Sequence, residues 1–535
     1  MQRFFKRLIK FLAYTAAGIV ILLAIAVGLF RLLLPKLPEY QDELKVWASD
    51  AIGMQVEFSG MDARWGLSGP ELNFYDAELI RTANNARLLA AAEVSIGVGL
   101  LRLLRDRTVV VDRILIRETA VEVRERADGR WWIQGTTLDQ LTAVNGGSAQ
   151  PVGDIEVIGE DIELQLIRLG ERQPTLFDIA RVTVARDETR IAVDSSIRLP
   201  ENMGRQMTVG ATRLINLPPE ERHWDVTVTA RGLDLAGWTA LADDVAMPLR
   251  SGGGDVELSV RVNDRTLSQA TAEFEFANLA AAEPEAPVFD TAGRLEYRQD
   301  ENGWLLALDE FTLQGPNGSW PESALRFEVG KGDEGSLEMV DLRADYLNVA
   351  DVALALPWLP EAERERIGRY EPDGIFRNLS LSIAALDTER ADFAVSSEFE
   401  GLGFAALGDI PGVRNLSGRL RADRSGGLAD IDAVDVEIDL PRFLSVTVPL
   451  DDVYGTLIWR QSGERITVLS DSIVLRNADI STNSNVELTL SKADGPVIDL
   501  SSTFSVTEIG GVKRFIPDRL LKPRLYNWFQ DALVS

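Results

Sequence analysis

The chain of 535 residues has no cysteine and a single histidine, His223. The absence of cysteine excludes disulfide bonds, thiolate metal sites and cysteine nucleophiles. One histidine without a recognisable motif around it is a poor basis for a catalytic triad or a histidine-ligated metal site. We therefore expect no catalytic residues, no metal and no cofactor, and we do not expect an enzyme.

Positive charge is also scarce. The chain has 55 Lys and Arg against 83 Asp and Glu, and its formal net charge is −28. A chain this acidic is a poor partner for nucleic acid, because basic side chains must neutralise the phosphates. We therefore expect no nucleic-acid partner.

Charged residues are absent from one long stretch near the amino terminus, residues 11–30. As a helix at ~1.5 Å per residue it spans roughly 30 Å, the thickness of a bilayer's hydrocarbon core. The basic residues before it are Arg3, Lys6, Arg7 and Lys10. Because no acidic residue precedes it, the positive-inside rule predicts a cytoplasmic amino terminus. A cleaved signal peptide is the alternative, but Leu34 and Pro35 follow where a small-residue cleavage site is needed.

These features predict five segments. Residues 1–10 form a basic cytoplasmic tail, and 11–34 form an uncleaved transmembrane helix. The anchor positions include Phe11, Ile19, Leu22 and Phe30. Apolar residues at helical spacing predict an amphipathic juxtamembrane helix at 35–53, and a further helix begins within 520–535. All 83 acidic residues follow the anchor, so the bulk of the chain lies across the membrane.

Residues 54–519 have a dominant hydrophobic period of two. Ile162, Leu164 and Leu166, for example, alternate with charged or amide residues. Such runs are typical of strands with one apolar and one solvated face, and Gly-rich turn clusters separate them. Strand and helix do not alternate regularly, so the sequence predicts a mainly β fold rather than a doubly wound α/β sheet.

The sequence also contains an internal echo. Gly293, Leu295 and Tyr297 recur as Gly455, Leu457 and Trp459, and a looser copy begins at Gly418. Each copy indicates a strand, a polar turn and a second strand. Two interpretations remain open here, either similar but unrelated hairpins or a repetitive β array whose units pack on their neighbours.

A group of arginines lies early in the acidic part of the chain. Its members are Arg102, Arg105, Arg107, Arg113 and Arg117. A solvated helix end and strand explain them without a ligand. The functional alternative is contact with anionic lipid head groups near the membrane, for which Arg102, Arg105, Arg107 and Arg113 are the candidates.

Several short stretches match a known family in order and spacing. They are the anchor followed by residues 37–44, Met61-Asp-Ala-Arg64-Trp65, Gly129-Arg130-Trp131-Trp132, and Ile410-Pro411-Gly412-Val413-Arg414-Asn415-Leu416-Ser417-Gly418. With these stretches the chain resembles the AsmA-like family, in its YhdP branch. Members of this branch are longer, and the sequence stops inside an apparent helix, so we expect an amino-terminal portion.

The resemblance implies an elongated, twisted β-sheet curled into a groove of repeated β units, with a few short helices. It implies non-enzymatic transport of phospholipids between the inner and outer membranes by a bacterial inner-membrane protein with its bulk in the periplasm. Expected partners are phospholipids, the inner membrane and an outer-membrane or periplasmic protein. The residues that alternation nominates as groove lining are Ile162, Leu164, Leu166, Val226, Val228, Phe274, Phe276, Val434, Val436 and Ile438.

A scaffold or assembly factor for outer-membrane proteins or envelope complexes is the competing hypothesis. Its β surface would bind protein rather than lipid. An exposed strand edge over a closed core favours the scaffold, whereas a continuous open apolar surface favours transport.

Overall fold

The computed structural model describes residues 28, 40–52, 55–65, 70–81, 86–98, 111–127, 131–134, 136–137, 155–170, 173–218, 221–240, 248–263, 266–332, 336–355, 357, 361–385, 392–408, 410–491, 497–519 and 521–532. The chain divides into two compact units. Unit 1 comprises residues 1–231 and 261–265, and unit 2 comprises residues 232–260 and 266–535. Apart from Gly28, the tail and transmembrane helix predicted for 1–34 lie outside the described residues. Within the ranges above, no helix is both long and apolar enough to cross a membrane.

Unit 1 contains one helix followed by strands. The helix α2 spans Gln41–Ile52, inside the range predicted for an amphipathic helix. The strands are β1 (Gln55–Glu57), β2 (Gly60–Trp65), β3 (Pro70–Arg81), β4 (Ala86–Val98), β5 (Val111–Glu125), β6 (Trp131–Ile133), β7 (Thr136–Thr137), β8 (Ile155–Ile167), β9 (Thr175–Arg186), β10 (Arg190–Arg198), β11 (Gln206–Leu214) and β12 (His223–Asp234), the last of which ends in unit 2.

The strands of unit 1 pair mainly with their neighbours in sequence. Antiparallel pairing runs from β2 to β5 and again from β8 to β12. Between these stretches β5 pairs with β8 in parallel, and the short β6 pairs with the end of β5. Parallel neighbours need a long crossover connection, which here is residues 126–154.

Unit 2 contains the remaining strands. They are β13 (Leu249–Asn263), β14 (Thr266–Ala281), β15 (Phe289–Asp300), β16 (Gly303–Gly315), β17 (Gly318–Ser319), β18 (Ser323–Lys331), β19 (Leu337–Asn348), β20 (Asp373–Ala384), β21 (Asp392–Phe404), β22 (Gly412–Asp423), β23 (Gly426–Asp439), β24 (Val448–Ser462), β25 (Arg465–Arg476), β26 (Ile480–Ser491) and β27 (Val497–Val506). Its helices are α5 (Leu235–Ala240), η4 (Val349–Asp351), α6 (Val352–Ala355), α7 (Glu361–Tyr370), α8 (Ile509–Val512), η6 (Lys513–Phe515) and α9 (Pro523–Ala532).

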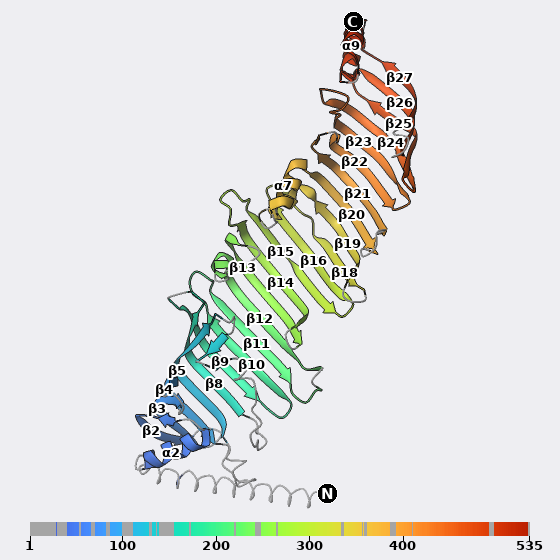
Figure 1. Cartoon of the computed structure of the whole chain (residues 1–535). Helices are drawn as coiled ribbons and strands as arrows, with labels where there is room; N and C mark the ends of the chain where they lie inside the picture. The colour runs from blue at the N-terminus through green and yellow to red at the C-terminus, as the bar shows by residue number, and fades with distance from the viewer. Residues whose placement is uncertain are drawn as a thin grey trace, which may run out of the picture. The chain divides into compact units, whose positions relative to one another are not determined.

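From β14 onwards each strand pairs antiparallel with the next, apart from the short β17 beside β16. Figure 1 shows the strands of unit 2 side by side, with short helices at their ends. The mainly β fold with few short helices is confirmed.

Many strands are interrupted near their middle by a residue in the left-handed conformation. In unit 1 these residues are Asp76, Glu118 and Asp161, and in unit 2 they are Asn278, Glu310, Asn378, Asn415 and Asp435. In unit 2 the pairing register shifts beside several of them, for example between Phe276 and Leu279. Such β-bulges bend the strand and increase its twist. Each bulge therefore divides its strand into two halves that run in different directions.

In unit 2, short helices and loops cover the sheet on one side of the bulges. A first cluster joins Leu279, Phe289, Leu313, Trp320, Tyr346 and, from α6, Leu354. A second cluster joins Ala433, Val436, Leu444, Val448, Leu450 and Val453, with Phe515 of η6 packed against it. The buried aspartate Asp351 fixes the first cluster, because it accepts hydrogen bonds from Trp320 Nε1 at 2.5 Å and Asn317 Nδ2 at 2.9 Å. The apolar faces that remain uncovered lie on the other side of the bulges.

Candidate functional site

In unit 1 the pairing register aligns apolar residues of successive strands. Residues directly opposite each other in a sheet point to the same face. The row that ends at Val226, called here the Val226 row, consists of Ala63, Leu72, Ile96, Ile114, Val157, Val184, Val193, Ala211 and Val226. Every member is apolar, although the strands come from widely separated parts of the sequence.

A second row lies two residues away on the same face. This Val228 row consists of Met61, Phe74, Val94, Ile116, Gly159, Val182, Ser195, Val209 and Val228. Its one polar side chain is the small hydroxyl of Ser195. The two rows together form a continuous apolar strip, which we call the apolar face of unit 1.

Unit 2 has an equivalent strip of its own. The Phe327 row consists of Ala270, Tyr297, Leu306, Phe327, Leu342, Leu381, Val395, Ala422, Gly427, Trp459, Val468, Leu488 and Ile498. Its members are half-buried or exposed, and Leu306 and Ile498 keep 36% and 63% of their surface accessible. A row of this length without a charged side chain defines the apolar face of unit 2.

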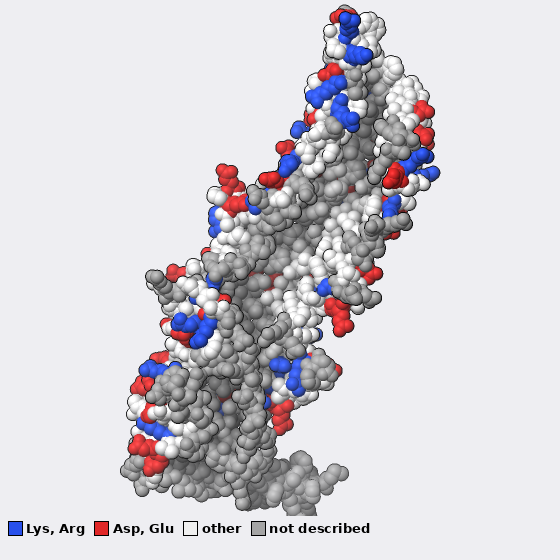
Figure 2. Space-filling model, in the orientation of Figure 1, with Lys and Arg blue, Asp and Glu red and all other residues white. Residues whose placement is uncertain are grey.

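The residues one position along each strand belong to the opposite face. In unit 2 this Glu328 row consists of Gln269, Arg298, Leu305, Glu328, Asp341, Ser382, Ala394, Asp423, Gly426, Arg460, Thr467, Thr489 and Val497. A cross-strand ion pair lies on the same face, between Arg294 and Glu273 at 3.0 Å. In Figure 2 the described charged side chains of unit 2 gather along the margins of the face in view.

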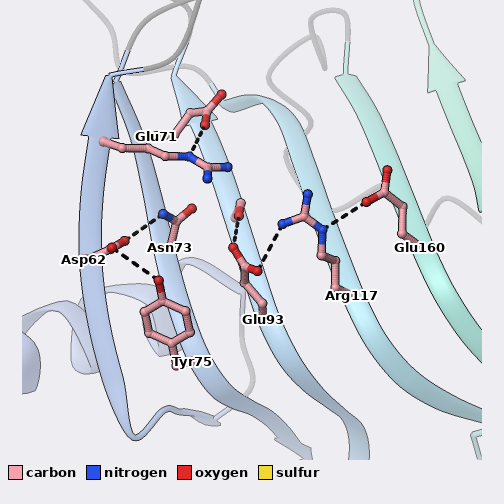
Figure 3. A network of polar contacts seen from close by, with 9 residues as sticks. Asp62, Glu71, Asn73, Tyr75, Glu93, Arg117 and Glu160 are labelled. Carbon is pink, nitrogen blue, oxygen red and sulfur yellow. Dashed lines mark hydrogen bonds and ion pairs between the residues drawn. The ribbon is translucent and has the colours of Figure 1, made fainter.

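The charged face of unit 1 carries a ladder of alternating charge, shown in Figure 3. Arg117 contacts Glu93 at 3.0 Å on one neighbouring strand and Glu160 at 3.0 Å on the other, and Glu160 also contacts Arg181 at 3.2 Å. The hydrogen bond that Arg117 donates to Glu160, with a smaller contribution from its bond to Glu93, raises the pKa of Arg117. The guanidinium therefore stays charged and links β4, β5 and β8 across the one parallel junction of unit 1.

The ladder continues into neutral polar residues on β2 and β3. Asp62 accepts hydrogen bonds from Asn73 Nδ2 at 2.7 Å and from the Tyr75 hydroxyl at 3.2 Å (Figure 3). Among the residues that the structure describes, no group of His, Cys, Asp or Glu is arranged to hold a metal ion. These contacts join strands and leave the apolar face of unit 1 free of charge.

Half of the nominated lining residues come together on the apolar face of unit 1. Val226 and Val228 are the last members of their rows. Beyond the bulge at Asp161, Ile162 opposes Ile179 and Leu164 opposes Phe177, and Leu166 follows on the same side. Bulges in the neighbouring strands keep these residues on one face with the two rows.

The nominated residues of unit 2 divide between different environments. Phe274 and Phe276 lie on the apolar face, with their rings stacked at 5.5 Å. Val436 is fully buried in the second cluster, and Ile438 packs against that cluster. Val434 is 57% exposed and lies on the opposite face, because Asp435 adopts a left-handed conformation with φ of 52° and breaks the alternation. Simple alternation therefore groups residues that the bulge separates.

Of the four arginines predicted to contact lipid head groups, only Arg113 lies among the described residues. Arg113 lies on the charged face of unit 1, where its Nε is 3.7 Å from Glu156, and Arg102, Arg105 and Arg107 lie outside the described residues. His223 begins β12, with Nε2 3.4 Å from Asp225. The anchor residues Phe11, Ile19, Leu22 and Phe30 also lie outside the described residues.

The chain was compared with models of known protein families. The family model described as YhdP protein matches residues 1–535. This chain belongs to the YhdP family. The resemblance predicted from sequence is thereby confirmed.

Sequence comparison matches the chain to a curated relative, the intermembrane phospholipid transporter YhdP of Escherichia coli (strain K12). It is 20% identical over 566 aligned residues, which cover 99% of this chain and 42% of the relative. The chain therefore spans less than half the length of that relative. No solved structure matches the chain.

The internal echo of this YhdP-family chain falls at equivalent positions in unit 2. Tyr297 of the first copy and Trp459 of the second copy are both members of the Phe327 row. Leu295 and Leu457 lie two residues away on the same face, and the third copy contributes Ala422 to the same row. The repeated segments are thus strands that present the same sequence pattern to one apolar face.

None of the nominated lining residues is a member of the Phe327 row. Phe327 and Leu342 each have charged neighbours on both sides in the sequence, so the signal was present. The pairing register between strands could not be predicted, because the sequence of a single strand does not specify which residues of another segment lie opposite it.

Proposed function

We propose that this YhdP-family chain forms an apolar groove along which phospholipids pass between the inner and outer membranes, without chemical conversion. The observation that supports the proposal is the pair of apolar faces, one in each unit, each backed by a charged face. Soluble proteins rarely leave continuous apolar surface uncovered unless it contacts a ligand, a membrane or another protein.

A lipid needs such a surface because exposing its acyl chains to water is costly in free energy. A lipid with ~30 methylenes costs on the order of 25 kcal/mol to carry through water, at ~0.8 kcal/mol per CH₂. Successive strands lie about 4.8 Å apart, so a row with one apolar residue per strand offers a new contact every few ångströms. The acyl chains rest on the apolar rows while the head group stays in water.

The proposed setting follows from the amino-terminal sequence. The stretch 11–34 anchors the chain in the inner membrane with its amino terminus in the cytoplasm, and the strands lie in the periplasm. The name of the Escherichia coli relative, an intermembrane phospholipid transporter, supports the proposed cargo. A periplasmic or outer-membrane partner protein receives the lipid.

A protein-binding scaffold is the second candidate, because an uncovered apolar face can contact a partner protein as well as a lipid. On β27, Val497, Leu500 and Phe504 are 59%, 57% and 67% exposed. The two functions differ in what contacts the Phe327 row, lipid in one case and protein in the other.

Site-specific photocrosslinking in cells distinguishes them. The probe replaces Phe327 in the full-length protein, and the matched control replaces its neighbour Glu328 on the opposite face. We expect phospholipid adducts at Phe327 and none at Glu328. Leu164 and Glu163 of β8 form the same kind of pair in unit 1.

Protein adducts without lipid at both Phe327 and Leu164 would reject the transport proposal and favour the scaffold. Equal lipid labelling of Phe327 and Glu328 would show only unspecific contact with membranes, and would also reject a defined path.

A further inference from the structure

Aromatic residues and glycines oppose each other on the apolar face of unit 2. In three places a ring on one strand has a glycine as its direct register partner on the next strand. The pairs are Phe274 with Gly293, Phe399 with Gly418, and Trp459 with Gly427. A glycine opposite an aromatic residue leaves room for the ring to lie against the neighbouring strand.

The geometry at the glycines shows that the rings occupy this room. A Cβ atom at Gly427 would lie 2.2 Å from Cζ2 and 2.7 Å from Cε2 of Trp459. At Gly418 it would lie 3.0 Å from Cζ of Phe399, and at Gly293 it would lie 3.4 Å from Cζ of Phe274. Only at Gly427 is a ring atom the nearest neighbour, because the backbone oxygen of Asp430 lies closer at Gly418 and the Cα atom of Phe311 lies closer at Gly293.

The strand beneath Trp459 has no freedom to move away from an added side chain. The same Cβ position at Gly427 lies 2.7 Å from the backbone oxygen of Arg421, on the strand at the other side. Gly427 pairs with Ala422 on that side and with Trp459 on the other. A methyl group at 427 therefore meets the backbone of one neighbouring strand and the indole of the other, and the side chain is the part that can move, so we expect the indole to swing outwards from the sheet.

We propose that Gly427 sets the clearance of the lipid path at Trp459, by letting the indole lie flat on the sheet. This inference rests on the proposed transport function. The Phe327 row requires bulky residues for apolar contact, yet an indole standing up from the sheet obstructs the passage of an acyl chain. Pairing the ring with glycine supplies apolar contact area at low height.

The test uses lipid photocrosslinking in cells with the probe at Val468, the next member of the row after Trp459. Three variants of the full-length protein are compared with the unmodified protein: Gly427→Ala, Trp459→Leu, and the two combined. The matched control is Gly330→Ala on the charged face, where an added Cβ would lie 3.3 Å from Cβ of Met339 and no neighbour is closer. Protein level and protease resistance are measured in every case.

We expect Gly427→Ala to lower the yield of lipid adducts at Val468 several-fold relative to the unmodified protein. Trp459→Leu is the reference for the combined variant, and we expect the combined variant to match it, because no indole remains to be raised. Gly330→Ala behaves like the unmodified protein.

An unchanged yield in Gly427→Ala overturns the inference. A yield in the combined variant that stays below that of Trp459→Leu overturns it as well, since the loss then comes from strain against Arg421 rather than from the indole. If the unmodified protein gives no lipid adduct at Val468 or at Phe327, the proposed function itself fails, and that result is distinct from both outcomes above.

Discussion

A carboxylate placed in the middle of the apolar face of unit 2 provides a demanding test of the lipid path. Leu381 lies between Leu342 and Val395 in the Phe327 row. The substitution Leu381→Asp keeps the strand and puts a charge where acyl chains are proposed to pass. The matched control, Ser380→Asp, adds the same group to the other face of β20, opposite Arg343.

The expected effect follows from placing acyl methylenes beside a hydrated carboxylate. If roughly four methylenes of a passing chain lie at position 381, exposing them to this water costs about 3 kcal/mol at ~0.8 kcal/mol per CH₂. Since 1.4 kcal/mol corresponds to a tenfold change, the step past β20 slows on the order of 100-fold. Leu381→Ala removes part of the side chain without adding charge, and we expect a much smaller effect.

The assay follows pulse-labelled phospholipid into the outer membrane, in cells whose only copy of the full-length protein carries the variant. Strong slowing by Leu381→Asp with near-normal rates for Ser380→Asp and Leu381→Ala supports the reasoning. Equal rates for the two aspartate variants would refute it, because the two faces of β20 would then be equivalent. The amount of folded protein is compared by protease resistance, so that unfolding is not mistaken for obstruction.

Three further predictions concern stability. Trp320→Phe leaves an oxygen of the buried Asp351 without its donor, and we expect chemical denaturation of the purified protein to show a loss of about 2 kcal/mol; a change under about 0.5 kcal/mol would contradict this. Arg117→Met breaks both cross-strand ion pairs of a side chain that is 33% exposed, so we expect a loss of about 1 kcal/mol that shrinks in high salt, and a salt-independent loss would argue against an electrostatic cause. The hydrogen bonds from Thr189 lower the pKa of Asp187 from 3.8 to about 2; the ionised carboxylate therefore stabilises the β9–β10 turn above pH 3.8, and this contribution is lost as the pH falls through about 2. Hydrogen exchange should show a weaker turn in Asp187→Asn at neutral pH and no difference from the unmodified chain below pH 2, and a difference that persists there would contradict the assignment.

The alternation of apolar and polar residues in the sequence predicted most of the strands. The runs around Ile162, Val226 and Phe274 are strands, and the two faces of each differ as the pattern predicts. The pattern failed at Val434, where one left-handed residue shifts every later side chain to the other face. Asp, Asn and Glu occupy such positions in several strands, and nothing in a single-strand pattern marks them, because the same residues are common on solvated faces.

Surfaces that are built from several strands and loops could not be predicted from the sequence. The Phe327 row depends on pairing between strands, and the burial of Val436 depends on a cluster that includes Leu444 and Phe515 from connecting segments. Both depend on tertiary contacts that local periodicity does not encode. The echo of Gly293 in Gly455 was the one feature that anticipated a shared position in the sheet.

The order of strand pairing has a consequence for how the chain reaches its native state. From β14 to β27 almost every strand pairs with the strand just before it, so each new hairpin adds to an edge that already exists. Contacts of this kind are short in sequence, which favours rapid, stepwise growth in the order of synthesis. The junction of β5 with β8 is different, because its loop-closure entropy must be overcome before any strand contact forms. The pairing of β5 with β8 is therefore the slow step in the folding of unit 1, whereas unit 2 folds by adding one strand after another.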